Sequence, residues 1–148
     1  MLLRDTKGQR QVPIWLDHSQ AHNIMAGIEN LRPDHPLTHD LMVDLLEIGN
    51  LYLERVIIHS IDEKTFRAVL KIQVSRDEKE ENTNKTPSKV EIGCRPSDAI
   101  ALAVRAKCSI WISEEVVSEA SIAVDAEADQ EDREEFLYRF LEQFAQKE

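Results

Sequence analysis

The feature that most constrains the fold is an uninterrupted apolar run that begins directly after a polar turn. Residues 99–104 carry no polar side chain, and Pro96 precedes them by three positions. Proline suits the first position of a helix, because its missing N–H has no partner there in any case. Ser97 and Asp98 then fall in the first turn, where short polar side chains and negative charge suit the unpaired N–H groups. The pattern predicts a helix that is buried on most sides, at a corner where a strand leads into it.

The rest of the chain alternates between predicted strands and helices, so the expected fold is a single compact α/β (α+β) domain. In this fold a mixed β-sheet is packed by helices, and a C-terminal amphipathic helix follows. Period-two alternation and turn signals predict the strands, and capping residues with apolar faces predict the helices. The predicted strands are 12–16, 53–61, 65–74, 90–94 and 109–112 with a strand remnant at 1–4, the predicted helices are 17–27, 38–48 (with Thr38 as N-cap), 96–105 and 129–146, and residues 75–89 are expected to form a loop.

The C-terminal part is set apart by its charge. The whole chain has a net charge of −10, and residues 112–148 contain twelve of the acidic and only three of the basic side chains. We expect residues 1–118 to form the domain and residues 119–148 to form an acidic segment with the terminal helix. Three of the four phenylalanines lie four positions apart on that helix, and this stripe is expected to cover either the body or a second copy of the chain.

The remaining composition narrows the class of protein. The body before residue 112 is nearly neutral, which neither supports nor excludes the binding of nucleic acid. No stretch approaches the roughly 18 apolar residues of a membrane span, and no signal segment opens the chain, so a cytoplasmic location is expected. Cys94 and Cys108 are too few for a disulfide framework or a zinc site, and we expect buried, reduced thiols.

Two clusters of polar residues carry candidate chemistry. His39 and Asp40 lie at a predicted helix start, where an imidazole and a carboxylate suit general acid–base work. Alternatively, Asp40 only complements the helix dipole and His39 fills a polar gap. Arg95 and the free N–H groups behind it suit a phosphate, and Asp98 with Asp40 suits a hard divalent ion such as Mg²⁺ or Mn²⁺. The structural alternative is an Arg95–Asp98 pair that braces the turn, with Ser97 tying it.

The sequence resembles the bifunctional nuclease family, whose name reflects activity on DNA and RNA. The resemblance implies a compact α/β domain around a mixed sheet, a homodimer and a nuclease. The family usually has a strand before residue 1 and a Glu-Ala pair where this chain has Gln20 and Ala21, so an edge of the sheet and that acidic group are expected to be absent. The segments that carry the resemblance are Pro13–Trp15, Pro36–Leu41, Arg95–Leu102 and Ile110–Val117.

Two functions are therefore expected as alternatives. The first is a nuclease that cleaves phosphodiester bonds of DNA or RNA with the help of a divalent metal, in which Arg95 contacts phosphate, Asp98 binds metal or orients water, and His39 moves a proton. The second is a non-catalytic homodimeric module for protein interaction or regulation. The residues expected at the site are Asp98, His39 and Asp40 for catalysis, Arg95, Ser97 and Thr38 for substrate binding, and Asp98 with Asp40 for the metal.

Overall fold

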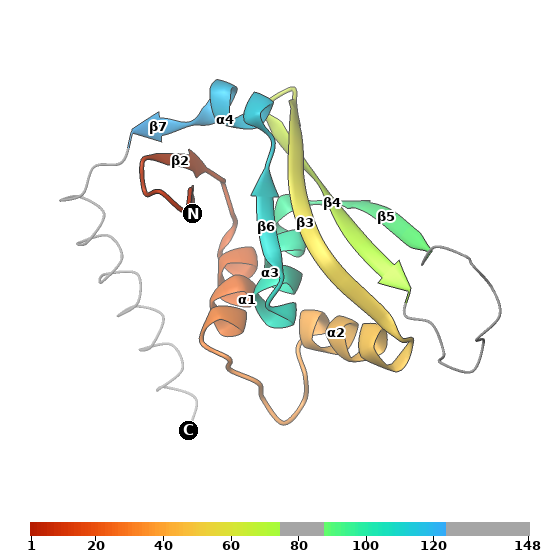
Figure 1. The fold of residues 1–148 in the computed structure, drawn as a ribbon. Coiled ribbons are helices and arrows are strands. Elements are labelled where there is room, and N and C mark those ends of the chain that lie inside the picture. Colours follow the sequence, from red (N-terminus) through yellow and green to blue (C-terminus); the bar gives the residue numbers. More distant parts are fainter. Residues whose placement is uncertain (75–87, 124–148) are drawn as a thin grey trace, which may run out of the picture.

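The computed structural model describes residues 1–74 and 88–123 of the chain. The predicted terminal helix at 129–146, its phenylalanine stripe and most of the predicted loop at 75–89 lie outside these residues. The described residues form two sheets and four helices, which confirms the predicted α/β class (Figure 1). The helices are α1 (His18–Ile28), α2 (Thr38–Ile48), α3 (Pro96–Ala106) and α4 (Glu114–Ala120). The strands are β1 (Leu2–Arg4), β2 (Arg10–Pro13), β3 (Leu51–Asp62), β4 (Thr65–Val74), β5 (Lys89–Cys94), β6 (Ser109–Ile112) and β7 (Ile122–Ala123).

The larger sheet has the strand order β5-β4-β3-β6 and is mixed, as expected. β5, β4 and β3 pair antiparallel, whereas β6 runs parallel to β3 after the chain has crossed over through α3. β3 contains two bulges, at Glu54 and His59. At each bulge β3 has one residue more than the stretch of β4 with which it pairs. A bulge shifts the alternation of a strand by one residue. Leu53, Val56 and Ile58 therefore all reach the buried face despite their uneven spacing.

α3 lies against this inner face of the sheet, with α1 and α2 packed beside it (Figure 1). The predicted apolar run behaves as expected, because residues 99–103 are all buried. On β4 the buried residues Ala68, Leu70 and Ile72 alternate with more exposed ones that point to the opposite face. The core therefore lies between α3 and one face of the sheet. None of the helices in the described part of the chain is long and apolar enough to cross a bilayer.

Two predicted boundaries are wrong by a few residues. The strand predicted at 12–16 is β2 at Arg10–Pro13, and it pairs with β1, the predicted remnant, and with β7. Pro13 ends it because proline has no N–H to donate to a further ladder bond. The helix predicted to be capped by Thr38 has Leu37 as its N-cap, and the Asp40 carboxylate accepts the Leu37 N–H at 2.9 Å in place of a threonine cap.

A buried ion pair holds the three larger helices together. Nε of Arg105 on α3 donates to Oδ1 of Asp40 on α2 at 2.6 Å, and the two side chains are only 6% and 8% exposed. Nη1 of the same guanidinium donates to the backbone carbonyls of Asn23 on α1, at 2.8 Å, and of Ala101, at 2.9 Å. The arginine needs Gly27 beside it, because a Cβ there would lie 2.6 Å from Nη1. One side chain therefore fixes α1, α2 and α3 relative to one another.

We expect Gly27→Val to lower the free energy of unfolding, since the added side chain would displace both the guanidinium and Val104. Overpacking of this kind costs about 1–3 kcal/mol, which exceeds the few tenths that valine gains over glycine in helix propensity. Urea unfolding at neutral pH measures the change. Gly93→Val is the matched control, because a Cβ at Gly93 on β5 meets no atom within 4 Å. Equal stability of the two variants would contradict the role given to Gly27.

Candidate functional site

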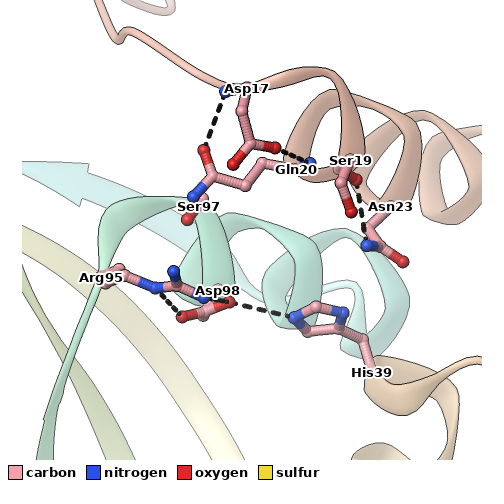
Figure 2. A pocket seen from close by; sticks show the side chains of 8 residues that line it. All are labelled: Asp17, Ser19, Gln20, Asn23, His39, Arg95, Ser97 and Asp98. Atoms are coloured by element: carbon pink, nitrogen blue, oxygen red, sulfur yellow. Dashed lines mark hydrogen bonds and ion pairs between the residues drawn. The ribbon is translucent and has the colours of Figure 1, made fainter.

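A polar pocket with a volume of about 200 Å³ opens where the N-terminal ends of α1, α2 and α3 approach one another (Figure 2). Its lining comes from three separate stretches of the chain and consists wholly of polar side chains. The lining residues are Asp17, Ser19, Gln20 and Asn23 from α1 and its cap, His39 from α2, and Arg95, Ser97 and Asp98 from the start of α3. His39 contributes the only ring among these lining residues, and no Phe, Tyr or Trp is among them, so the pocket suits a polar group rather than a stacked base.

The α1 wall of the pocket is built by a capping box. The Asp17 carboxylate accepts the Gln20 N–H at 2.8 Å, and the Gln20 side-chain oxygen accepts the Asp17 N–H at 3.0 Å. This reciprocal pair satisfies two N–H groups at the helix start. Asp17 and Gln20 thus fix this wall through hydrogen bonds to each other. The family resemblance implied a glutamate at position 20, and Gln20 brings an uncharged amide to the pocket instead.

Arg95 and Asp98 form a two-point ion pair at the other wall. β5 ends at Cys94, so Arg95 becomes the extended N-cap of α3, and its side chain turns back over the first helical turn. Nε donates to Oδ2 of Asp98 at 2.7 Å, and Nη2 donates to Oδ1 at 3.1 Å. The bonds from Arg95 are the main cause that lowers the pKa of Asp98, with a smaller contribution from His39. Asp98 is therefore a carboxylate at neutral pH.

His39 approaches the same carboxylate from α2. Its Nε2 lies 3.4 Å from Oδ1 of Asp98, and Figure 2 shows the ring edge and the Arg95 guanidinium both directed at Asp98. The Nδ1 atom of the ring is buried and has no hydrogen-bond partner. The nitrogen that faces the pocket is thus Nε2. The imidazole, the carboxylate and the guanidinium form one continuous polar chain across the pocket.

The predicted site residues divide into two groups. The structure brings together Asp98, His39, Arg95 and Ser97 in the pocket. Asp40 and Thr38 do not line it, although both are neighbours of His39 in the sequence. Asp40 turns inward to Arg105, as its burial requires a partner, and Thr38 is an exposed residue of the first turn of α2.

Sequence reasoning missed the contribution of α1 to the pocket. Ser19 and Asn23 lie one helical turn apart and therefore on one face, and the Asn23 amide donates to the Ser19 carbonyl at 3.0 Å. The i, i+4 spacing of two polar residues near a helix start was the available signal. It did not identify the side of the domain that this face meets, because that depends on how Arg105 docks α1.

The described residues do not fit a divalent-metal site. Both oxygens of Asp40 are used, one by Arg105 and one by the Leu37 N–H, and Asp98 is held by Arg95. Hard divalent cations take several oxygen ligands at once. Within residues 1–74 and 88–123, no three His, Cys, Asp or Glu side chains come together in a way that would hold a metal ion.

The two cysteines are free thiols, as expected, and each is partly rather than fully buried. Cys94 precedes Arg95, and burial together with the charge of Asp98 raises the pKa of its thiol to about 11. A thiol with that pKa is almost wholly protonated at neutral pH and is a poor nucleophile. Cys94 is therefore not a candidate for covalent catalysis.

Comparison with known proteins places the chain in a sequence family. The model of the bifunctional nuclease domain matches residues 1–125, a span that includes the four segments that carry the resemblance. Two curated relatives come from two strains of Mycobacterium tuberculosis and are both described as uncharacterized proteins. Each is 32% identical to this chain over 131 residues, which is 88% of this chain and 71% of the relative.

The lowered pKa of Asp98 predicts a pH-dependent contribution to stability. A carboxyl group whose pKa is lower in the folded state stabilises the protein above its unfolded pKa of about 3.9, and this stabilisation is lost as the pH falls through the folded value. We expect Asp98→Asn to lower the free energy of unfolding at pH 7 by about 0.5 kcal/mol, the scale of a partly screened ion pair. The difference from the wild type should persist at pH 5 and shrink below pH 4.

Urea unfolding at a series of pH values measures this difference. Asp34→Asn, at an exposed position outside the pocket, is the control and should leave the stability nearly unchanged at each pH. A difference between Asp98→Asn and the wild type that grows as the pH falls below 4 would show that Arg95 does not stabilise the ionised form of Asp98.

Proposed function

The chain belongs to the bifunctional nuclease domain family, and we propose on this basis that it is a nuclease whose pocket between α1, α2 and α3 cleaves phosphodiester bonds. The observation that carries the proposal is the convergence of His39 and Arg95 on the single carboxylate of Asp98. A proton-transfer group and a fixed positive charge side by side are what attack on a phosphate diester requires.

Arg95 supplies the phosphate contact in this proposal. Asp98 uses the Nε and Nη2 atoms of the guanidinium, which leaves the N–H groups of Nη1 for a second anion. The side chain is largely exposed, so a phosphate reaches it without rearrangement of the core. The N–H groups at the start of α3 lie at the same wall and favour negative charge there. Together they bind the non-bridging oxygens of the diester.

His39 handles the proton. Its Nε2 accepts a proton from the attacking oxygen, either water or a ribose hydroxyl, as that oxygen forms its bond to phosphorus. The bond from phosphorus to the leaving oxygen breaks, and the proton is returned to that oxygen. Oδ1 of Asp98 lies 3.4 Å from this same Nε2, so the attacking oxygen takes its place at Nε2, and the adjacent carboxylate charge then stabilises the imidazolium that forms. Since Asp98 and Asp40 are each held by an arginine, no step in this scheme is assigned to a metal.

Loss of His39 or of Arg95 is expected to impair cleavage, each in its own way. A positioned general base contributes about 10²- to 10⁴-fold to the rate, so His39→Ala should reduce cleavage of single-stranded RNA and DNA by a factor in that range. Arg95→Gln should chiefly weaken substrate binding and so raise KM. Gel-based cleavage assays, run with EDTA and with added Mg²⁺, measure both effects.

Two matched controls separate these effects from contamination. His35→Gln changes an exposed histidine outside the pocket, and Arg67→Gln breaks the exposed Arg67–Asp62 pair at the distant β3–β4 turn. Both variants should cleave at the wild-type rate. Equal activity of His39→Ala and the wild type would refute the proposed site, and equal inactivity of all the proteins would refute the nuclease.

An apolar face on α2 favours a second proposal, that the chain forms a homodimer. Leu41, Leu45 and Ile48 lie on one face of the helix and point away from the core, and Ile48 is 78% exposed. The opposite face of α2 already packs on the core through Val43 and Leu46. Covering exposed aliphatic surface is favourable by a free energy of roughly 25 cal/mol for each Å² removed from water. We propose that α2 of a second copy covers this face.

Light scattering coupled to size-exclusion chromatography tests the dimer. The wild type should elute with twice the chain mass, and Leu45→Glu combined with Ile48→Glu should elute as a monomer, because two buried carboxylates would oppose the interface. Ile122→Glu replaces an exposed isoleucine on β7 and should leave the dimer intact. A monomeric wild type, or a dimeric double variant, would rule out this interface.

A further inference from the structure

The outer face of the larger sheet, which points away from α3, combines an exposed aromatic ring with basic side chains. The pairing register aligns the outward residues in rows that cross the strands. One row runs from Trp111 on β6 through Ile57 and Val69 to Gly93 on β5. The next row consists of Ser109, Arg55, Lys71 and Glu91. An apolar row thus lies directly beside a charged one.

Trp111 is the most distinctive residue of this face. Its side chain is 54% exposed, and its indole N–H donates to the Ser109 hydroxyl at 2.9 Å, which fixes the ring along β6. The guanidinium carbon of Arg55 lies 5.3 Å from the centre of the ring, the geometry of a cation–π contact. A large aromatic side chain held in place yet open to solvent is a ready surface for stacking.

Beside the charged row lies a hollow of about 140 Å³ with three cations and two carboxylates along its walls. Glu54 accepts from Arg55 and Lys89, and Glu91 accepts from Lys71. Exposed ion pairs of this kind contribute little to stability. A phosphate can therefore compete with the glutamates for the cations, and the net charge of this hollow favours an anion.

These features together match the platforms on which proteins bind single-stranded nucleic acid. Such platforms combine aromatic side chains that stack on bases with cations that follow the backbone. We propose that the outer sheet face around Trp111 and Arg55 binds single-stranded nucleic acid. The face is a sheet with no protruding helix among the described residues, which suits unpaired bases better than the groove of a duplex.

The position of this face relative to the pocket gives it a role in the proposed nuclease. The apolar row ends at Gly93, which lies two residues before Arg95 and has open space around its Cα. Three strand spacings of about 4.8 Å separate Trp111 from Gly93, a span of about 14 Å. β5 is the edge strand of this sheet, so a strand that follows the row would pass around that edge to reach Arg95 and the pocket on the α3 side. This role rests on the proposed function, whereas binding by the sheet does not.

Fluorescence anisotropy with short labelled oligonucleotides tests the binding. Single-stranded RNA or DNA should bind the wild type more tightly than a duplex of the same sequence. Trp111→Ala should weaken binding about tenfold or more, and Trp111→Phe should retain most of it. Trp15→Ala is the matched control, since Trp15 is 89% exposed but lies after β2, outside this sheet. Arg55→Gln should also flatten the salt dependence.

A second readout follows the ring itself. The chain has two tryptophans, so Trp15→Phe leaves Trp111 as the single tryptophan, whose fluorescence can be excited selectively over that of the two tyrosines. Its emission should be quenched on titration with single-stranded nucleic acid. Circular dichroism before each titration confirms that the variants are folded, which is expected because Trp111 points outward.

The outcomes distinguish this inference from the proposed function. Binding that depends on Trp111 but not on His39, without any cleavage, would support the platform and refute the nuclease. Cleavage that requires His39 while Trp111→Ala binds like the wild type would refute the platform alone. Conversion of a dimer to a monomer by Trp111→Ala, with unchanged nucleic-acid binding, would show that a second copy occupies this face and would also refute the inference.

Discussion

The buried pair between Arg105 and Asp40 is the interaction on which the rest of the arrangement depends. Two charges are removed from water, and this is tolerated only because the guanidinium also reaches the carbonyls of Asn23 and Ala101. Asp98 lies seven residues before Arg105, two turns along the same face of α3. Because His39 is the neighbour of Asp40, the same two helices meet twice, once inside the protein through Asp40 and once at the pocket through His39. The inner contact sets the geometry of the outer one.

This double contact explains why the two carboxylates at the interface of α2 and α3 do not fit a metal centre. Each carboxylate that meets α3 has an arginine of its own, Arg105 for Asp40 and Arg95 for Asp98. The charge of Asp98 is thus compensated before any ligand enters, and its remaining partner is an imidazole. The Asp98 carboxylate is therefore suited to orient the imidazole of His39 and to stabilise its protonated form, rather than to attack a substrate. The chemistry we propose follows from that division of roles.

The sequence predicted well what local patterns determine. The apolar run after Pro96, the alternation on β4 and the hairpin at residues 62–64 each encode their element within a few residues, and all three are present. The partners of charged residues are a different matter. Asp40 was expected beside His39 in the site, because the sequence shows only that both start a helix. Whether a carboxylate at a helix start points outward or inward depends on an arginine 65 positions away.

The rows on the outer sheet face were invisible for the same reason, since they are assembled from four strands in a register that includes two bulges. Those bulges have a further consequence. Each adds one residue to β3 and so inverts which residues face the core, from Leu53 to Val56 and again after Ile58. A conservative exchange of side chains along β3 is therefore expected to disturb the core less than a change in the length of the strand. An insertion or deletion of one residue there would shift the register, and the core-facing side chains beyond that point would face solvent.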